Sequence, residues 1–317
     1  MKNLVDISSP AIIKTLADPR RLEILAILMS APSSLTRLAE QLNQSPAWVR
    51  HHMLALQRAG LVEMDEIRPH GKTREKIYRA RAGALYIHQI VLPKSKKPTI
   101  LFAGSHDIAL DEISKQLADD ANLIGMPIGS LDGLINLRQG ICHLSGVHLL
   151  DENGEYNLPF VRRLFPEQQV RCINLALRVQ GLILAPGNPL SISTLQDLAR
   201  PEIRLIQRNP GSGTRLWLDR AFIGLGVLPV APVRRVNTHI QAAECIHNRI
   251  GDVALGLQAA AARFGLEFIP LFEEPYDLVF FKDQENLLQP ILDFLQTRRC
   301  RQILSALPGY NVQHSNV

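Results

Sequence analysis

The sequence predicts an α/β protein in two parts, a winged helix-turn-helix followed by a larger α/β domain, and three observations support this class. The chain has 317 residues, which fits two domains better than one small core. Residues 1–97 contain 16 Lys and Arg against 8 Asp and Glu, while the remainder contains 19 against 22. Near residues 93–98 the apolar pattern changes from helical spacing to short runs that alternate with amphipathic stretches. A basic part attached to a mildly acidic one is typical of a nucleic-acid-binding module joined to another domain.

The first part carries three predicted helices. Asp18-Pro19 and Ser45-Pro46 are typical helix starts, a capping side chain followed by proline at the first helical position. The spacing of apolar residues predicts helices over 19–31, 35–42 and 46–59. Because the last two are short and joined by a tight turn, they form a predicted helix-turn-helix.

The second of these helices and the hairpin after it are the predicted DNA-binding elements. A recognition helix reads base edges with residues near its N-terminus. The strands around 61–63 and 76–78 enclose a basic, glycine-containing tip that suits a wing lying on phosphates. Trp48 could equally pack under the wing, and His51 could be an ordinary helix-surface histidine. The predicted DNA contacts are Ser45, Ala47, Trp48, Arg50 and His51 on the helix and Arg68, His70, Lys72 and Arg74 on the wing.

The second part has the alternation of strands and helices that predicts a mostly parallel sheet. Residues 80–91, just before it, are expected to form a helix that helps dimerisation. Three turns, 103–107, 128–132 and 209–215, each follow a predicted strand and open a helix with glycine and a hydroxyl residue. Such turns bring backbone N–H groups and a helix N-terminus close to a ligand, and three of them predict a shared cleft for a small anion or polar molecule.

The predicted ligand-binding residues are Ser105, His106, Asp107, Ser130, Arg178, Gly211, Ser212, Gly213, Thr214 and Arg215. Alternatives remain open for several of them. Asp107 could be a helix cap, since a carboxylate beside an anion is repulsive unless it is tied to His106 or an arginine. Arg215 could be salt-bridged on its helix. His143 and His148 are expected to be structural.

Other chemistry is not indicated. The sequence has no P-loop, no dinucleotide fingerprint, no H-E-x-x-H and no nucleophile paired with a base. Its four cysteines lack the spacing of a disulfide framework or a zinc site. The residues therefore predict no catalytic site, no metal and no resident cofactor beyond a possible bound oxyanion. The chain also lacks a signal peptide and a membrane-spanning apolar run, so it is expected to be cytoplasmic.

Two phrases near the N-terminus carry a family resemblance. LADPRRLEIL at 16–25 and HHMLALQRAGLV at 51–62 resemble ArsR-type winged-helix regulators over about residues 10–80. The helix over 35–42 lacks the cysteine motif of metal-sensing members, which moves the expected sensor out of this part. The resemblance implies a homodimer that binds double-stranded DNA.

The second part resembles the periplasmic-binding-protein-like domains that are fused to helix-turn-helix heads or to molybdopterin-biosynthesis proteins. The similar phrases are AGSHD at 103–107, HLSGVHLLD at 143–151, EYNLPFVRR at 155–163 and GSGTR at 211–215. The resemblance implies a two-lobed type II fold over 99–317, with lobe one at 99–183 plus 278–312, lobe two at 184–275, a DNA-binding domain at 1–92 and a linker at 93–98.

The expected function is a ligand-responsive, DNA-binding transcriptional regulator that senses a small anion in the cleft between the lobes. Because domains of the group that the second part resembles are fused to molybdopterin-biosynthesis proteins, the resemblance implies molybdate or tungstate as the ligand. Phosphate, sulfate or an amino-acid-like molecule are the alternative ligands. An enzyme of molybdenum-cofactor metabolism and a body that only dimerises are the alternative functions.

Overall fold

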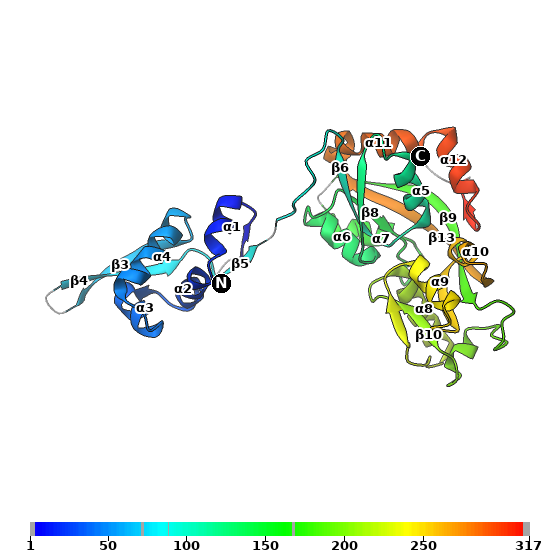
Figure 1. The fold of residues 1–317 in the computed structure, drawn as a ribbon, viewed down its shortest axis with the longest axis horizontal. Coiled ribbons are helices and arrows are strands. Elements are labelled where there is room, and N and C mark those ends of the chain that lie inside the picture. Colours follow the sequence, from blue (N-terminus) through cyan, green and yellow to red (C-terminus); the bar gives the residue numbers. More distant parts are fainter. Residues whose placement is uncertain (1–3, 71–72, 88, 167–168, 313–317) are drawn as a thin grey trace. The chain divides into compact units, whose positions relative to one another are not determined.

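Residues 4–70, 73–87, 89–166 and 169–312 are described in the computed structural model. The chain divides into two units, Met1–Val91 and Leu92–Val317, and both combine helices with strands (Figure 1). The elements of the first unit are β1 (Leu4–Ile7), α1 (Pro10–Leu16), α2 (Pro19–Ser30), β2 (Ser33–Ser34), α3 (Leu35–Gln41), α4 (Pro46–Arg58), β3 (Val62–His70), β4 (Thr73–Ala80) and β5 (Ala84–Ile87).

The helices of the first unit begin where the sequence predicts. The Asp18 side chain accepts from the backbone N–H of Arg20 at 3.1 Å and caps α2. Ser45 caps α4 by accepting from the backbone N–H of Trp48 at 3.2 Å, and Pro46 stands at the first helical position. The apolar sides of α2, α3 and α4 pack into one buried core. This confirms the predicted helix-turn-helix, and β3 pairs antiparallel with β4 as the predicted hairpin.

The prediction of a helix over residues 80–91 is wrong. Residues Ala84–Ile87 form strand β5, which pairs in parallel with β1. No strand was predicted at β1, so the partner that makes an extended conformation favourable here was missed. Gly83 also disfavours a helix at this point, whereas Tyr86 and Ile87 favour a strand.

The second unit contains the remaining elements. They are β6 (Thr99–Gly104), α5 (Ile108–Gln116), β7 (Asn122–Pro127), α6 (Ser130–Arg138), β8 (Leu144–Val147), α7 (Leu158–Leu164), β9 (Val170–Leu184), η1 (Gln196–Ala199), β10 (Leu205–Arg208), α8 (Gly213–Leu225), β11 (Arg234–Val236), α9 (His239–His247), β12 (Val253–Leu257), α10 (Gln258–Arg263), β13 (Glu267–Phe281), η2 (Lys282–Gln284), α11 (Glu285–Leu295), α12 (Arg298–Ser305) and β14 (Tyr310–Asn311).

Within the described residues of this unit, one nine-stranded sheet runs in the order β11-β10-β12-β9-β13-β8-β6-β7, with β14 added to β9. We call the part built on β6, β7 and β8 lobe one and the part built on β10, β11 and β12 lobe two. The two 15-residue strands β9 and β13 pair antiparallel and join the lobes (Figure 1). Inside each lobe the short strands are parallel, so the predicted parallel character holds within the lobes but not across their junction.

Candidate functional site

The outer face of α4 carries most of the predicted DNA contacts. Ala47, Arg50 and His51 are exposed near the start of the helix, where a recognition helix reads bases. Trp48 is half-buried and packs against the core of the first unit, with its ring 4.4 Å from that of His52 in an edge contact. The structure therefore gives Trp48 a packing role, while the base-reading roles of the exposed residues stay predictions.

The predicted wing is the hairpin of β3 and β4. Arg68 and Arg74 are exposed on it, and Arg68 also forms an ion pair with Glu66. His70 is the last residue of β3, and Lys72 lies outside the described residues. The wing contacts to phosphate stay predictions as well.

The three glycine-containing turns lie at the carboxyl ends of β6, β7 and β10, and two of them touch across the lobes. A side chain at Gly129, in lobe one, would place its Cβ 3.1 Å from the carbonyl of Gly211 in lobe two. A Cβ at Gly213 would lie 2.2 Å from the carbonyl oxygen of His148. The Asn209 amide donates across the same junction to the carbonyl of Ile128 at 3.0 Å. Glycine at these positions allows the two lobes to close on each other.

A buried group of charged side chains joins lobe one to the crossing strands, and we call it the ion network: Asp107, His148, Arg178 and Glu274. Arg178 donates to Glu274 through Nε at 3.0 Å and Nη2 at 2.7 Å, and to Asp107 through Nη1. Glu274 is also 2.9 Å from Nδ1 of His148. Burial opposes ionisation of Glu274, but His148 and Arg178 outweigh it and lower the pKa of the carboxyl.

The acids of the ion network are saturated with donors. Asp107 caps α5 by accepting from the backbone N–H of Ala109 at 2.7 Å, and it accepts from the Tyr310 hydroxyl at 2.8 Å. Glu274 accepts from the Gln180 amide at 2.5 Å. The guanidinium of Arg178 lies 4.2 Å from the ring centre of Tyr276. Arg178 and Asp107, both predicted to bind ligand, are thus occupied with each other and with the fold.

A second buried group shows the opposite situation. The Nε and Nη1 atoms of Arg208, Oγ1 of Thr214, both ring nitrogens of His239 and Oε1 of Gln180 have no hydrogen-bond partner among the residues that the structure describes. All four side chains are buried, and we call them the unpartnered cluster. Buried polar atoms are nearly always hydrogen-bonded, because leaving such an atom without a partner costs about 1–3 kcal/mol. Such a concentration of unmet donors marks a place where a bound molecule would complete the bonds.

The unpartnered cluster adjoins the ion network at the junction of the lobes. Gln180 bonds Glu274, and the rings of His239 and His148 are 6.4 Å apart. Nη2 of Arg208 donates to the carbonyl of Asn237 at 2.9 Å. Burial lowers the pKa of Arg208 to about 9, and the neighbouring Arg178 adds to this. A negative charge placed here would relieve the cost of burying that guanidinium.

The remaining predicted ligand residues mostly have partners inside the protein. Oγ of Ser105 is 2.8 Å from Nε2 of His148, and Oγ of Ser130 accepts from the backbone N–H of His148 at 3.3 Å. Ser212 caps α8 by accepting from the backbone N–H of Arg215 at 3.3 Å, and its hydroxyl donates to the carbonyl of Asn209 at 2.9 Å. Because a hydroxyl that accepts one bond can still donate another, Ser130 keeps a donor for a ligand. The hydroxyl of Ser105 is used, since a neutral His148 gives its Nδ1–H to Glu274 and accepts from Ser105 at Nε2.

Arg215 follows the alternative that the sequence left open, whereas His106 pairs with Asp111 and not with Asp107. Nε2 of His106 is 2.9 Å from the carboxylate of Asp111, although its Nδ1 has no partner in the described part of the chain. Arg215 forms a helical ion pair with Asp219 at 2.6 Å. His143 is structural, since its Nδ1 accepts from the backbone N–H of Leu101 at 3.0 Å. Of the predicted set, Thr214 alone belongs to the unpartnered cluster.

The sequence did not indicate Arg208, His239 and Gln180. One signal was available for Arg208, because a charge ends the buried strand β10 directly before the turn at 209–211. His239 follows the capping Thr238 at the start of α9, which is an ordinary helix start. Only the pairing of β9, β10 and β12 brings these residues to one place.

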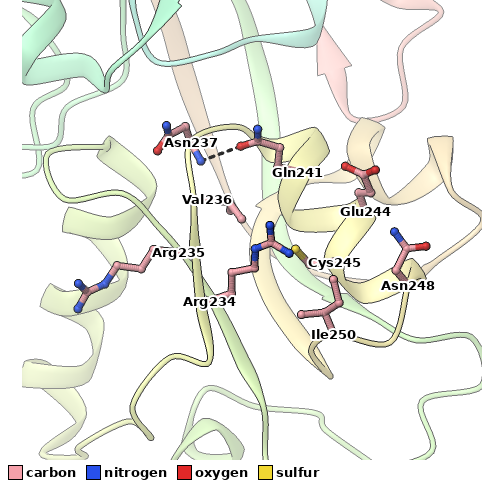
Figure 2. Close-up of a pocket in the computed structure, with 9 residues that line it drawn as sticks. All are labelled: Arg234, Arg235, Val236, Asn237, Gln241, Glu244, Cys245, Asn248 and Ile250. Carbon is pink, nitrogen blue, oxygen red and sulfur yellow. Dashed lines mark hydrogen bonds between the residues drawn. The ribbon is translucent and has the colours of Figure 1, made fainter.

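A pocket of about 350 Å³ lies elsewhere on lobe two, between β11 and α9. Figure 2 shows Arg234 reaching toward Cys245 and Arg235 extending the other way, with the backbone N–H of Asn237 bonded to Gln241 at 2.9 Å. The lining residues do not include any member of the unpartnered cluster. This pocket is therefore a separate surface feature.

Two features of the described residues bear on site chemistry. They contain no group of three or more His, Cys, Asp or Glu side chains arranged to hold a metal ion. No helix among them has both the length and the apolar character needed to cross a bilayer.

Comparison with known proteins matches both units. Residues 18–64 match the family described as bacterial regulatory protein, arsR family, and residues 112–296 match the PBP superfamily domain. The uncharacterized protein YvgK of Bacillus subtilis is 37% identical over 223 residues, which cover 68% of this chain and 72% of that protein. The uncharacterized HTH-type transcriptional regulator MJ0229 of Methanocaldococcus jannaschii is 33% identical over 81 residues, or 26% of this chain and 84% of that protein.

Solved structures show the same fold for the second unit. A putative phosphate ABC transporter substrate-binding protein with bound phosphate from Clostridium perfringens aligns with a TM-score of 0.51 at 12% identity, over 68% of this chain and all of the other. The sulfate-binding protein SubI from Mycobacterium tuberculosis aligns with a TM-score of 0.51 at 16% identity, over 69% of this chain and 88% of the other. At these identities the likeness shows the fold.

The fold and the two matched regions define a DNA-binding regulator fused to a ligand-binding domain of the type II periplasmic-binding-protein-like class. The chain belongs to the PBP superfamily, and its N-terminal head is an ArsR-family helix-turn-helix.

Proposed function

We propose that this protein is a ligand-responsive transcriptional regulator whose second unit closes on a small anion held at Arg208, Thr214 and His239. The observation that carries the proposal is the unpartnered cluster, in which a buried guanidinium has no carboxylate within ion-pair distance and lacks two of its hydrogen bonds among the described residues. Charged ligands are held in such sites by desolvated donors and helix N-termini. The helices α8 and α9 begin at Gly213 and His239, next to this cluster.

Closure couples the ligand to DNA. The contacts between Gly129 and Gly211 and between Asn209 and Ile128 join the two lobes, so a ligand that favours the closed form favours these contacts too. A change in the second unit would alter the affinity of the heads for DNA, and DNA would alter ligand affinity by the same factor. We also propose a homodimer, because winged heads usually bind two half-sites.

The candidate anions are those of the sequence analysis. Molybdate and tungstate are suggested by the resemblance to domains fused with molybdopterin-biosynthesis proteins. Phosphate and sulfate deserve equal testing because two proteins with this fold are described as binding them. Amino-acid-like ligands complete the set, since the site joins unmet donors to an unmet acceptor.

The proposal is tested by thermal unfolding of the full chain with each anion, followed by DNA binding with and without the anion that stabilises it. A ligand at about 100 times its Kd should stabilise the protein by about 2.7 kcal/mol. The same anion should change the Kd for operator DNA, and sedimentation should show a dimer. If no anion stabilises the chain, or if the stabilising anion leaves DNA affinity unchanged, the proposal is wrong.

A further inference from the structure

Gln180 adds an acceptor to a site otherwise rich in donors. Its Nε2 donates to the Glu274 carboxylate at 2.5 Å. A carboxylate accepts and cannot donate, so this bond fixes which end of the amide is nitrogen and leaves Oε1 pointing elsewhere. Oε1 is fully buried and meets no donor in residues 4–70, 73–87, 89–166 and 169–312. A molecule that satisfies this oxygen must bring a hydrogen of its own.

His239 makes a similar demand. Burial lowers the pKa of its imidazole well below the ordinary value, and the adjacent Arg208 and Arg178 act in the same direction. A neutral imidazole has one N–H and one bare nitrogen. Both ring nitrogens are buried, and neither meets a partner in the described chain. The ring therefore offers a ligand one donor and one acceptor.

The charges of the site limit how negative its occupant can be. Asp107 and Glu274 balance Arg178 and Arg208, so these four buried side chains sum to zero when His148 is neutral. Burial lowers the pKa of His148, which favours that neutral form despite Glu274. The starts of α8 and α9, where Thr214 and His239 lie, add about half a positive charge each. This positive potential suits one negative charge better than two.

We propose, on the basis of the function above, that the ligand is a small monoanion that carries its own hydrogen-bond donor, and not a fully deprotonated dianion. Arg208 and Thr214 hold the negative oxygens, while a hydroxyl or ammonium hydrogen of the ligand is donated to Oε1 of Gln180. A hydroxy-carboxylate or an amino acid with two carboxylates meets these conditions, and so does phosphate in its dihydrogen form. Molybdate, tungstate and sulfate carry no hydrogen at neutral pH and meet neither condition.

Two matched pairs of ligands test the proposal by calorimetry on the full chain at pH 6.5. Phosphate is compared with sulfate, and glycolate with acetate, because each pair differs in the presence of an O–H. We expect the hydrogen-bearing member of at least one pair to bind about tenfold tighter or more, since an unmet buried acceptor penalises its analogue. The pair that responds identifies the source of the anion.

The variant Gln180→Met removes the acceptor at similar size and should lower the ratio within the responding pair. For glycolate and acetate, which carry the same charge, the ratio should fall to about one. Gln207→Met is the matched control, because Gln207 is also a buried glutamine, but its amide oxygen accepts from Arg215. Its ratio should stay as in the wild type. If Gln180→Met does not fold, as judged by circular dichroism, the wild-type ratios still decide.

Tightest binding of molybdate, tungstate or sulfate would overturn this inference and leave the proposed function standing. Equal affinities within both pairs would overturn it too. If no anion binds, and if Arg208→Met does not change thermal stability in the presence of any of them, the proposed function itself is wrong.

Discussion

Two buried arginines of the second unit have opposite surroundings. Arg178, on β9, places all three guanidinium nitrogens on carboxylates of Asp107 and Glu274. Arg208, at the end of β10, places one nitrogen on a backbone carbonyl and leaves two without a partner in the chain as described. The sequence placed Arg178, and not Arg208, among the predicted ligand residues. The comparison teaches that burial of a charge does not mark a binding site, whereas the state of its hydrogen bonds does.

The first prediction, with the largest expected effect, concerns removal of the partnered arginine. Arg178→Met leaves two buried carboxylates without their cation, and we expect a loss of about 3–5 kcal/mol in the free energy of unfolding, measured by denaturant titration. Arg171→Met is the matched control on the same strand, because its ion pair with Glu285 is about half-exposed and should be worth about 0–1 kcal/mol. A loss below about 1 kcal/mol for Arg178→Met would mean that its network does not hold the fold.

The second prediction concerns the unpartnered arginine. Arg208→Met removes a buried guanidinium that no carboxylate of the described residues contacts, so the free protein should be as stable as the wild type or more stable. Stabilisation by the anion, about 2.7 kcal/mol at 100 times Kd, should disappear. Thermal unfolding with and without the anion measures both. A variant that loses stability like Arg178→Met but still responds to the anion would reverse the roles assigned here.

The contrast also shows how far the sequence could predict this molecule. Asp18 and Ser45 act through local rules, so their helices and the α/β class of the second unit were predictable. The three turns were correctly placed at strand ends for the same reason. Strand β5 was missed because its partner β1 is about 80 residues away in the chain. Pairing between segments so distant in sequence depends on tertiary packing, which leaves no local sequence pattern.

The candidate site was less predictable than the fold. The turn residues Ser105, Ser130 and Ser212 were indicated by composition, but each has a partner within the protein. Whether a polar residue is satisfied depends on a partner such as Glu274, which is 96 residues from Arg178. Only the structure shows which polar side chains lack a hydrogen-bond partner. It makes Arg208 and His239, and not the three serines, the leading candidates for ligand binding.

The third prediction concerns two solvent-exposed arginines of the DNA-binding unit. Arg50→Ala should weaken operator binding by about 1–3 kcal/mol and relax the preference at one base pair, because Arg50 is exposed at the start of α4. Arg74→Ala, on the wing, should weaken binding to all sequences and reduce the salt slope by about one. Fluorescence anisotropy with operator and scrambled DNA at several salt concentrations separates the two. Identical behaviour of both variants would contradict the docking of α4 on bases.

The smallest expected effect belongs to Arg220, whose partners come from the opposite lobe. Arg220, exposed on α8 of lobe two, donates to the carbonyl oxygens of Asp151 and Glu152 in lobe one. These bonds to neutral, exposed acceptors exist only while the lobes are closed, and each is worth about 0.5–1.5 kcal/mol at most. Arg220→Ala should therefore speed release of the anion and weaken its affinity about threefold to tenfold.

Stopped-flow dissociation measures the effect of Arg220→Ala, and Arg235→Ala is the control because that side chain extends from the rim of the lobe-two pocket (Figure 2). The stability of the free protein should change little in either variant. An unchanged dissociation rate for Arg220→Ala would mean that closure depends on the ligand contacts alone. A faster rate would add a third kind of arginine to the comparison, one that touches neither the acids nor the ligand and acts by holding the lobes together.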